Sequence, residues 1–397
     1  MTERQNVDSG RKPNIFEALF IIIIAVLLIL SAVKVFETDV HVPLAFSACV
    51  AAIVSMFVLK VKWSVVEEGI LNSILMGMQA MLILYTVGML IGVWIRSGVV
   101  PTMIYYGLDL LSPSMYLIAT LLICSVVSLA TGTSWGTSGT VGIALMGIGA
   151  GLGIPAPVSA GFVISGAYFG DKMSPLSDTT NLAPAMAGTD IFQHIRAMVW
   201  TTGPTYVIVM ITAWVMGMRY AGGALETEKI AAIQTLLSAE FNISPLGFLP
   251  PAIVITLAAC KKPALPSIFA GVLAGAVLAM VGGVNFGGLL DALQNGYVPA
   301  LSGELASAGE DLAAVAAVLS ENAVTSVTPE AAAGASGVLT ELLERGGLQS
   351  MNWTVSLILC ALTFGGILDR VGYLEVILDT CLKRVKSPGS LCASVVV

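Results

Sequence analysis

The chain has 397 residues, of which 56% are hydrophobic and only 11% are charged. Soluble globular proteins carry about 25% charged residues, so a chain of this length could not cover its apolar surface with polar groups. The mean hydropathy of +0.91 agrees. The composition therefore indicates a protein of the lipid bilayer and excludes a soluble enzyme, a disordered chain and a nucleic-acid-binding protein.

The formal net charge of −7 is concentrated in one segment. Between Gly282 and Ser350 the acidic residues outnumber the basic ones by eight to one. The six cysteines are scattered without a C-x-x-C pair, and only two histidines occur, His41 and His194. This pattern favours neither a disulfide framework nor a structural metal site, and we expect no cofactor.

Apolar segments along the chain predict an all-α, polytopic membrane protein, because a spanning helix needs about 20 mainly apolar residues. The first is expected to be an anchor, since its apolar run is too long for a signal peptide. The predicted spans are Ile15–Val33, Pro43–Leu59, Ile74–Ile95, Ala197–Met216, Pro245–Ala259, Leu265–Val281 and Trp353–Leu368.

Basic residues near the span ends predict the topology, because Lys and Arg favour the cytoplasmic side. Arg4, Arg11 and Lys12 place the N-terminus, residues 1–14, in the cytoplasm. Residues 15–217 then form a first transmembrane repeat and residues 218–246 an external connection. Residues 247–397 form a second repeat that contains the acidic external loop 282–350, in which Leu312–Leu319 suggests a short helix.

Two apolar stretches are interrupted by polar tracts. Thr131–Thr140 divides Tyr116–Leu152, and Gly170–Asn181 divides Pro157–Asp190. The topology requires the first stretch to enter and leave from outside, as two spans or a re-entrant hairpin, and the second to cross once as a broken helix. Irregular backbone at membrane depth is tolerated only inside protein or beside a wet cavity, so both tracts predict a buried polar site.

The two parts of the chain share a weak internal sequence repeat. Gly92–Gly98 resembles Gly366–Gly372, and a short amphipathic segment follows each copy, Pro101–Leu111 and Leu374–Leu382. By the predicted topology the two copies have opposite orientations, which is the plan of many secondary transporters. The second repeat has no counterpart of the two polar tracts before Val397, so we expect it to be incomplete.

The polar tracts contain the candidate ion ligands. A carboxylate inside the membrane is costly and marks an ion pathway, and hard cations prefer oxygen ligands. For Asp171 the alternative is a simple ion pair with Lys172 at the helix end. The cation ligands are expected to be Asp178, Asp171, Thr179 and Asn181, with further oxygens from Thr133, Ser134, Thr137, Ser174, Ser177 and Thr180.

A catalytic site is not expected. Gly132–Gly136 matches the G-x-S-x-G pattern of hydrolases, but that motif needs a strand–turn–helix context with Asp and then His downstream. Here the flanking segments are apolar and helix-like, and His194 is the single later histidine. We therefore predict a transporter and no enzyme.

The tract Gly170–Ala183, preceded by Ala130–Thr137, closely resembles the NhaC family of bacterial sodium/proton antiporters, as does Gly347–Met351 leading into Trp353–Gly366. The resemblance implies a multi-pass inner-membrane antiporter built from inverted repeats with re-entrant hairpins, which carries Na⁺ and H⁺. Family members continue into a second polar motif, so an inactive truncated fragment is an alternative. Another is coupled exchange of organic anions such as malate and lactate, for which Lys172 is the one base at the site. The oligomeric state stays open, a homodimer included.

Overall fold

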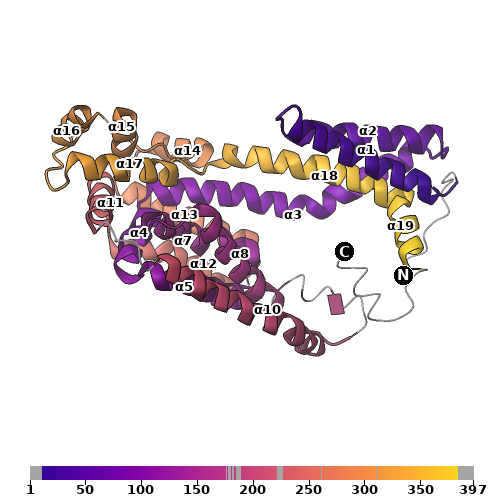
Figure 1. Cartoon of the computed structure of the whole chain (residues 1–397), viewed down its shortest axis with the longest axis horizontal. Helices are drawn as coiled ribbons and strands as arrows, with labels where there is room; N and C mark the ends of the chain where they lie inside the picture. The colour runs from indigo at the N-terminus through magenta and orange to yellow at the C-terminus, as the bar shows by residue number, and fades with distance from the viewer. Residues whose placement is uncertain are drawn as a thin grey trace. The chain divides into compact units, whose positions relative to one another are not determined.

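The computed structural model describes residues 11–175, 177, 180, 183–184, 189–220, 227–260, 262–309 and 311–382. These residues are almost entirely helical (Figure 1) and contain no β-strand, only an isolated antiparallel bridge between Tyr297 and Arg345. The expected all-α fold is confirmed.

Six helices in the described part of the chain are long and apolar enough to cross a membrane. They are α1 (Ile15–Lys34), α3 (Trp63–Arg96), α5 (Pro113–Thr131), α10 (Ile191–Tyr220), α13 (Ala264–Val281) and the helical segment Leu348–Val371, which includes α18 (Asn352–Val371). The predicted span Pro43–Leu59 corresponds to a shorter apolar helix, α2 (His41–Phe57). The predicted span Pro245–Ala259 pairs with the preceding helical segment Ile230–Glu240 across a bend of 92°.

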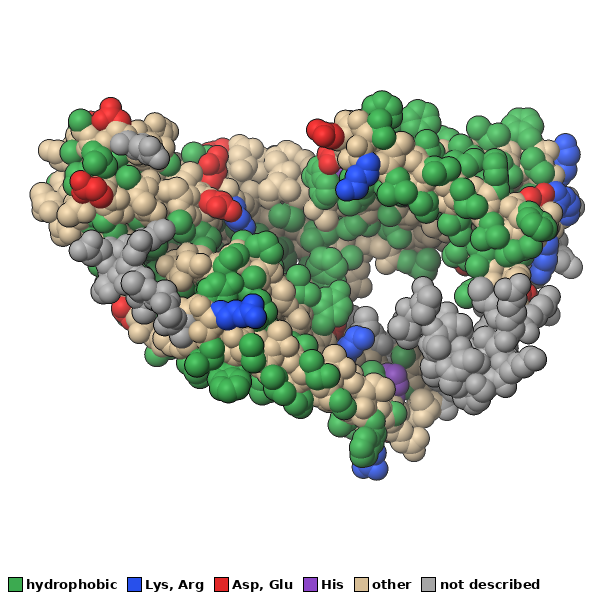
Figure 2. Space-filling model, viewed as in Figure 1, with side chains coloured by type: hydrophobic (Ala, Val, Ile, Leu, Met, Phe, Trp, Pro, Cys, Tyr) green, Lys and Arg blue, Asp and Glu red, His purple; other side chains and the backbone are tan. Residues whose placement is uncertain are grey.

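Contacts divide the chain into two compact units. The first contains residues 1–82 and 352–397, with α1, α2, the start of α3, α18 and α19 (Tyr373–Leu382). Figure 2 shows hydrophobic side chains over the visible face of α1 and α2, with the charged side chains gathered at the helix ends. The backbone N–H of Arg11 donates to the carbonyl of Leu59 at 3.0 Å, so the chain before α1 lies beside the chain after α2.

The second unit, residues 83–351, contains both polar tracts. Its membrane-crossing part is built around α5 and α8 (Ala156–Met173), which pack along each other, and α10 lies against both. Between α5 and α8 come α6 (Ser134–Thr137), a π-helical turn η1 (Ser138–Gly142) and α7 (Ile143–Gly151). The remaining elements are α4 (Val99–Leu110), α11 (Thr227–Glu240), η2 (Pro245–Phe248), α12 (Leu249–Ala259) and α13.

The acidic segment 282–350, expected as a loop with one short helix, is largely helical. The expected helix is present as α16, and three further helices and a 3-10 turn accompany it. They are α14 (Phe286–Asn295), α15 (Leu301–Ala308), α16 (Leu312–Glu321), α17 (Pro329–Leu343) and η3 (Leu348–Met351). Leu305, Leu319 and Leu339 are buried where these helices pack together, which a solvated loop would not allow.

Glu240, at the end of α11, is hydrogen-bonded to this helical segment. Its carboxylate accepts hydrogen bonds from the Tyr297 hydroxyl (3.0 Å), the backbone N–H of Ala300 (2.7 Å) and the Ser302 hydroxyl (2.7 Å). Burial and the neighbouring carboxylate raise the pKa of Tyr297. Its hydroxyl therefore stays protonated and remains a donor.

The two copies of the sequence repeat have the same local backbone. After α3 the chain turns at Gly98 (φ 79°) into α4, and after α18 it turns at Gly372 (φ 92°) into α19. Positive φ explains why both copies have a glycine at this position, because other residues rarely adopt this conformation. The opposite orientation of the copies stays a prediction.

Candidate functional site

The first polar tract forms the turn of a helical hairpin. α5 ends at Thr131, and Gly132 follows in the left-handed conformation (φ 68°), which ends the helix. Thr133 is extended and caps the next helix, since its hydroxyl accepts a hydrogen bond from the backbone N–H of Gly136 at 3.2 Å. The chain then returns through α6, η1 and α7, and π-helical turns of this kind are frequent at functional sites.

The second tract is brought to this turn by glycine packing between α8 and α5. A Cβ atom at Gly166 would lie 2.5 Å from the carbonyl oxygen of Leu121, and one at Gly170 would lie 2.4 Å from that of Ser125. The four-residue advance on both helices shows that they run in the same direction. Their C-terminal ends therefore lie together, as in the small-x-x-x-small contacts of membrane helices.

Asp171 is the carboxylate at this junction, and it is 8% exposed. Its Oδ2 accepts a hydrogen bond from the hydroxyl of Ser134 at 3.1 Å. Ser134 is the first residue of α6, so the bond joins the end of α8 to the start of the returning arm of the hairpin. No ion pair between Asp171 and Lys172 occurs in the described structure, so the simple helix-end pair is not formed.

Beyond α8 the chain folds back over the end of the helix. The Ser174 hydroxyl donates to the carbonyl of Leu129 (2.8 Å), which ties this segment to α5. The Thr180 hydroxyl lies 3.1 Å from the carbonyl oxygens of both Asp171 and Lys172, and its backbone N–H donates to the Ser177 hydroxyl (3.4 Å). Carbonyl groups at a helix end have no hydrogen-bond donor within the helix, and the Thr180 hydroxyl supplies a donor to them.

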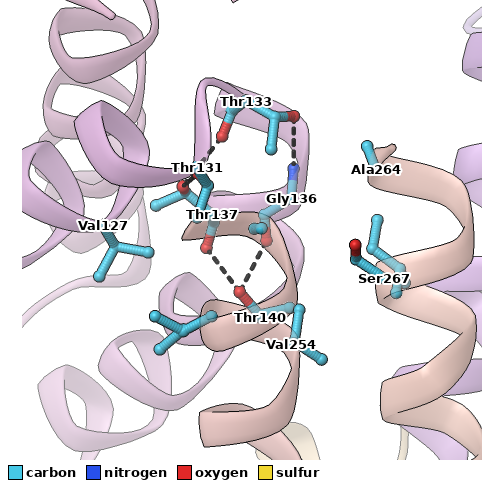
Figure 3. A pocket seen from close by; sticks show the side chains of 12 residues that line it. Val127, Thr131, Thr133, Gly136, Thr137, Thr140, Val254, Ala264 and Ser267 are labelled. Atoms are coloured by element: carbon cyan, nitrogen blue, oxygen red, sulfur yellow. Dashed lines mark hydrogen bonds between the residues drawn. The ribbon is translucent and has the colours of Figure 1, made fainter. Parts of the chain in front are cut away.

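A pocket lined by hydroxyl groups lies on another side of the hairpin turn (Figure 3). The hydroxyl of Thr137 donates to the carbonyl of Thr133 (2.9 Å) and that of Thr140 to the carbonyl of Gly136 (2.7 Å). Because these hydrogens are used within the helix, the oxygens remain as acceptors. Across the pocket, Ser267 of α13 likewise donates to its own helix, at Pro263 (2.9 Å). The surface that lines the pocket is almost entirely apolar, because these hydroxyls lie against their own helices, so the pocket itself does not point to a cation ligand.

The structure thus brings together part of the predicted ligand set. Asp171, Ser134, Ser174, Ser177 and Thr180 gather at the joined ends of α5 and α8, whereas Thr133 and Thr137 line the hydroxyl pocket. Three predicted ligands, Asp178, Thr179 and Asn181, lie outside the described residues. Among the residues that the structure describes, no group of three His, Cys, Asp or Glu side chains could hold a metal ion.

Sequence reasoning missed three hydroxyls of the pocket. Thr131 and Thr140 are the first and last residues of the predicted tract, so they could have been included among the expected ligands. Ser267 lies within a predicted apolar span, where a single serine is unremarkable, and only the fold places it opposite Thr140.

Interrupted helices that meet around a buried carboxylate, inside a bundle of membrane-spanning helices, define a multi-pass membrane protein of the secondary-transporter class. The family model described as "Na+/H+ antiporter family" matches residues 166–321 and 304–397. The chain belongs to this family.

Curated relatives cover nearly the whole chain. The Na⁺/H⁺ antiporter NhaC of Alkalihalophilus pseudofirmus is 35% identical over 97% of this chain and 76% of its own length. The malate-2H⁺/Na⁺-lactate antiporter of Bacillus subtilis is 37% identical over 98% of this chain and 76% of its own. The arginine/ornithine antiporter ArcD of Halobacterium salinarum is 34% identical over 97% and 73%. No solved structure matches the chain.

Proposed function

We propose that this chain is a secondary active antiporter that exchanges Na⁺ for H⁺ across the bacterial inner membrane. Family membership and relatives that are named Na⁺/H⁺ antiporters support this function. The N-terminus would lie in the cytoplasm, as the distribution of Lys and Arg indicates.

The observation that carries the proposal is the buried Asp171 carboxylate, held by Ser134 at the junction of α8 and the hairpin. A carboxylate at such a place costs about 2.5–3.5 kcal/mol on insertion scales, and a bound cation or proton offsets that cost. The Ser134 hydroxyl bonds to the carboxylate, and the Thr180 hydroxyl lies at the same end of α8, on the backbone carbonyl of Asp171. Oxygens of this kind can replace part of the hydration shell of Na⁺.

Exchange follows when Na⁺ and H⁺ compete for the same carboxylate. In the Na⁺-loaded state Asp171 is ionised and shares the ion with neutral oxygens, and in the proton-loaded state it is neutral. Asp178, Thr179 and Asn181, which follow in the same tract, complete the proposed ligand set. Because α8 and the hairpin are both interrupted at the site, a movement of one against the other would open it to each side in turn.

Substitution of Asp171 tests the assignment. Asp171→Asn keeps the shape but removes the charge for which the two ions compete, so Na⁺-dependent recovery of a pH gradient in proteoliposomes should fall to background. Asp291→Asn is the matched control, because Asp291 is exposed on α14 and hydrogen-bonds Asn295 there. The assignment is wrong if Asp171→Asn supports recovery at the rate of the control. Asp178→Asn is expected to behave like Asp171→Asn.

A further inference from the structure

The membrane-spanning helix α10 has two halves, and its C-terminal half is fixed on α5. The hydroxyls of Tyr206 and Ser125 pair at 2.8 Å. Further along, a Cβ atom at Gly217 would lie 2.4 Å from the carbonyl oxygen of Ser114, so the two backbones touch there. Ala213 and Gly217, the buried residues of α10, both belong to this half.

The N-terminal half of α10, Ile191–Thr202, has no such anchor. All of its residues are described, and none of them is buried. The side chains of Phe192 and Trp200 are 67% and 81% exposed. Membrane helices are held to each other by close packing and hydrogen bonds, so little in the second unit holds this half in one direction.

The junction of the two halves combines features that let a helix bend. Thr201–Thr205 reads Thr-Thr-Gly-Pro-Thr in the middle of α10. Pro204 has no N–H to donate to the carbonyl of Trp200, and its ring crowds that carbonyl. The hydroxyls of Thr201 and Thr205 donate to backbone carbonyls one turn earlier, both at 3.0 Å, and such bonds often bend helices.

Open space lies beside this junction, in a cavity of about 200 Å³ between α8 and α10. Thr202 lines the cavity from the N-terminal half of α10, and Lys172 lines it from the end of α8. On the other side, the rings of Phe169 and Tyr206 stack with centroids 3.7 Å apart. The N-terminal half can therefore move toward the end of α8 while the stacked rings keep the C-terminal half in place.

The start of α10 is joined to the chain that follows the second polar tract. The Asp190 carboxylate accepts hydrogen bonds from the backbone N–H groups of Phe192 (2.9 Å) and Gln193 (3.2 Å). The backbone N–H of Thr189 donates to the carbonyl of Pro184 at 3.0 Å. A movement of the helix start therefore carries with it the chain that leads back to the tract.

We propose that α10 bends at Gly203 and Pro204 during exchange, so that Ile191–Thr202 swings as an arm against the end of α8. The half from Tyr206 onward stays fixed on α5. The arm opens and closes access to the Asp171 carboxylate from this end of α8. This inference rests on the proposed ion exchange and adds to it the moving part and the hinge. The bend sets the rate of exchange and leaves the binding of Na⁺ unchanged.

The distance between the two ends of α10 measures the bend without any transport. Spin labels are placed on Phe192→Cys and Met218→Cys, at exposed positions, in the whole chain without native cysteines in proteoliposomes. We expect a broad distance distribution that shifts when Na⁺ at high pH is replaced by low pH without Na⁺. Pro204→Ala restores the N–H to the Trp200 carbonyl and should give one narrow peak at about 39 Å, as in a straight helix of this span. A narrow distribution that ions do not change, with Pro204 present, would overturn the hinge.

Exchange in the same vesicles shows whether the bend is used. Pro204→Ala should lower the maximal rate by about threefold or more, because gating movements limit turnover in many proteins, with no change in the Na⁺ concentration for half-maximal rate. Pro329→Ala is the matched control, since Pro329 lies in the first turn of α17, where proline removes no helical hydrogen bond. Equal rates in the two variants would overturn the proposal.

A reversible cross-link across the cavity identifies the half that moves. Lys172→Cys with Thr202→Cys joins α8 to the arm, and Ser165→Cys with Val209→Cys joins it to the fixed half, all from positions that line the cavity. A bifunctional methanethiosulfonate should stop exchange in the first pair, leave its binding of labelled Na⁺ intact and have little effect on the second pair. Reduction should restore exchange in the first pair.

The cross-links can also contradict the arm. It is excluded if the first pair exchanges equally well before and after reduction, if both pairs stop alike, or if the first pair loses Na⁺ binding. A different result would count against the proposed ion exchange alone. That result is a bend seen between the spin labels in a protein that exchanges no Na⁺ for H⁺ before cross-linking.

Discussion

At the scale of single residues, the hydroxyl of Ser134 is what ties the Asp171 carboxylate to the hairpin. This hydroxyl donates a hydrogen bond to Oδ2 of Asp171, and it belongs to a different helix from the carboxylate. Hydrogen bonds to charged groups are worth about 1.5–3 kcal/mol, more than those between neutral groups. Ser134 therefore orients Asp171 toward the oxygens of the turn.

Removal of this hydroxyl should weaken Na⁺ binding and leave the fold intact. We expect Ser134→Ala to raise the Na⁺ concentration for half-maximal exchange by about tenfold, with a smaller change in the maximal rate. Ser134→Thr, which keeps a hydroxyl, should retain most of the affinity. Ser307→Ala is the control, since Ser307 is exposed on α15 and donates to its own helix. Equal Na⁺ dependence in Ser134→Ala and Ser307→Ala would show that Ser134 has no part in the site.

The tracts that form the site could be predicted from the sequence, but not all of the contacts. Polar residues between apolar segments mark positions where the helical backbone is interrupted, and Asp171 and Ser134 indeed meet there. The different directions in which the adjacent side chains of Asp171 and Lys172 point could not be predicted. Asp171 faces the hairpin and Lys172 faces α10, and only the packing of α8 between those elements decides this. The place of Ser267 in the pocket could not be predicted for the same reason, because the pocket residues that it faces are far away in the sequence.

At the scale of helices, the close approach of α5 and α8 determines whether the two tracts can meet. Gly166 and Gly170 let the backbones touch, and Ser128 adds a hydrogen bond from its hydroxyl to the carbonyl of Ala167 at 2.5 Å. Membrane helices gain no hydrophobic drive from each other and depend on such packing and hydrogen bonds.

A methyl group at Gly170 should therefore separate the helices and disturb the site. Its Cβ would lie 2.4 Å from the carbonyl oxygen of Ser125 and 2.5 Å from the backbone nitrogen of Leu129, and backbone atoms cannot turn aside. Overpacking of this kind costs about 1–3 kcal/mol. Gly170→Ala should lower the melting temperature in detergent and reduce exchange.

Gly161→Ala is the matched control for this substitution. Gly161 lies on the same helix, with open space around the position of a Cβ. Alanine is favoured over glycine in a helix interior by up to about 1 kcal/mol, so this variant should be as stable as the parent or more so. A Gly170→Ala protein with the melting temperature of Gly161→Ala would mean that α5 and α8 are not in close contact.

The helices themselves were predictable to different degrees. Long apolar runs such as α1 and α13 show in composition alone, because the bilayer demands about 20 such residues. The helices between Gly282 and Ser350 were largely missed, because they are short and mix polar with apolar residues. Their stability comes from mutual packing of residues such as Leu305 and Leu339, and from the Glu240 carboxylate of α11, which accepts a hydrogen bond from the backbone N–H of Ala300 just before α15.

At the scale of the whole molecule, the distribution of charge predicts the orientation of the chain in the membrane. In the first unit, Arg11 and Lys12 before α1 and Lys60 and Lys62 after α2 lie at one end, since Arg11 bonds to Leu59. One end of an apolar helix pair thus carries the bases, as expected of the cytoplasmic side. Arg96 follows the third predicted span, so a cytoplasmic N-terminus predicts that it lies outside. Its guanidinium lies over the ring of Tyr297, 5.6 Å from the ring centroid, so its charge has a local partner in the acidic segment.

Cysteine labelling can test the orientation that this charge distribution predicts. Lys12→Cys and Ser307→Cys are introduced singly into a variant without native cysteines, at positions that are both exposed. Because bases favour the cytoplasm, a membrane-impermeant maleimide should label Ser307→Cys in intact cells and Lys12→Cys only after permeabilisation. Labelling of both after permeabilisation confirms that each thiol is reactive. The reverse pattern would place the acidic helices inside the cell. It would also turn the open ends of α5 and α8, with the proposed cation site, toward the outside.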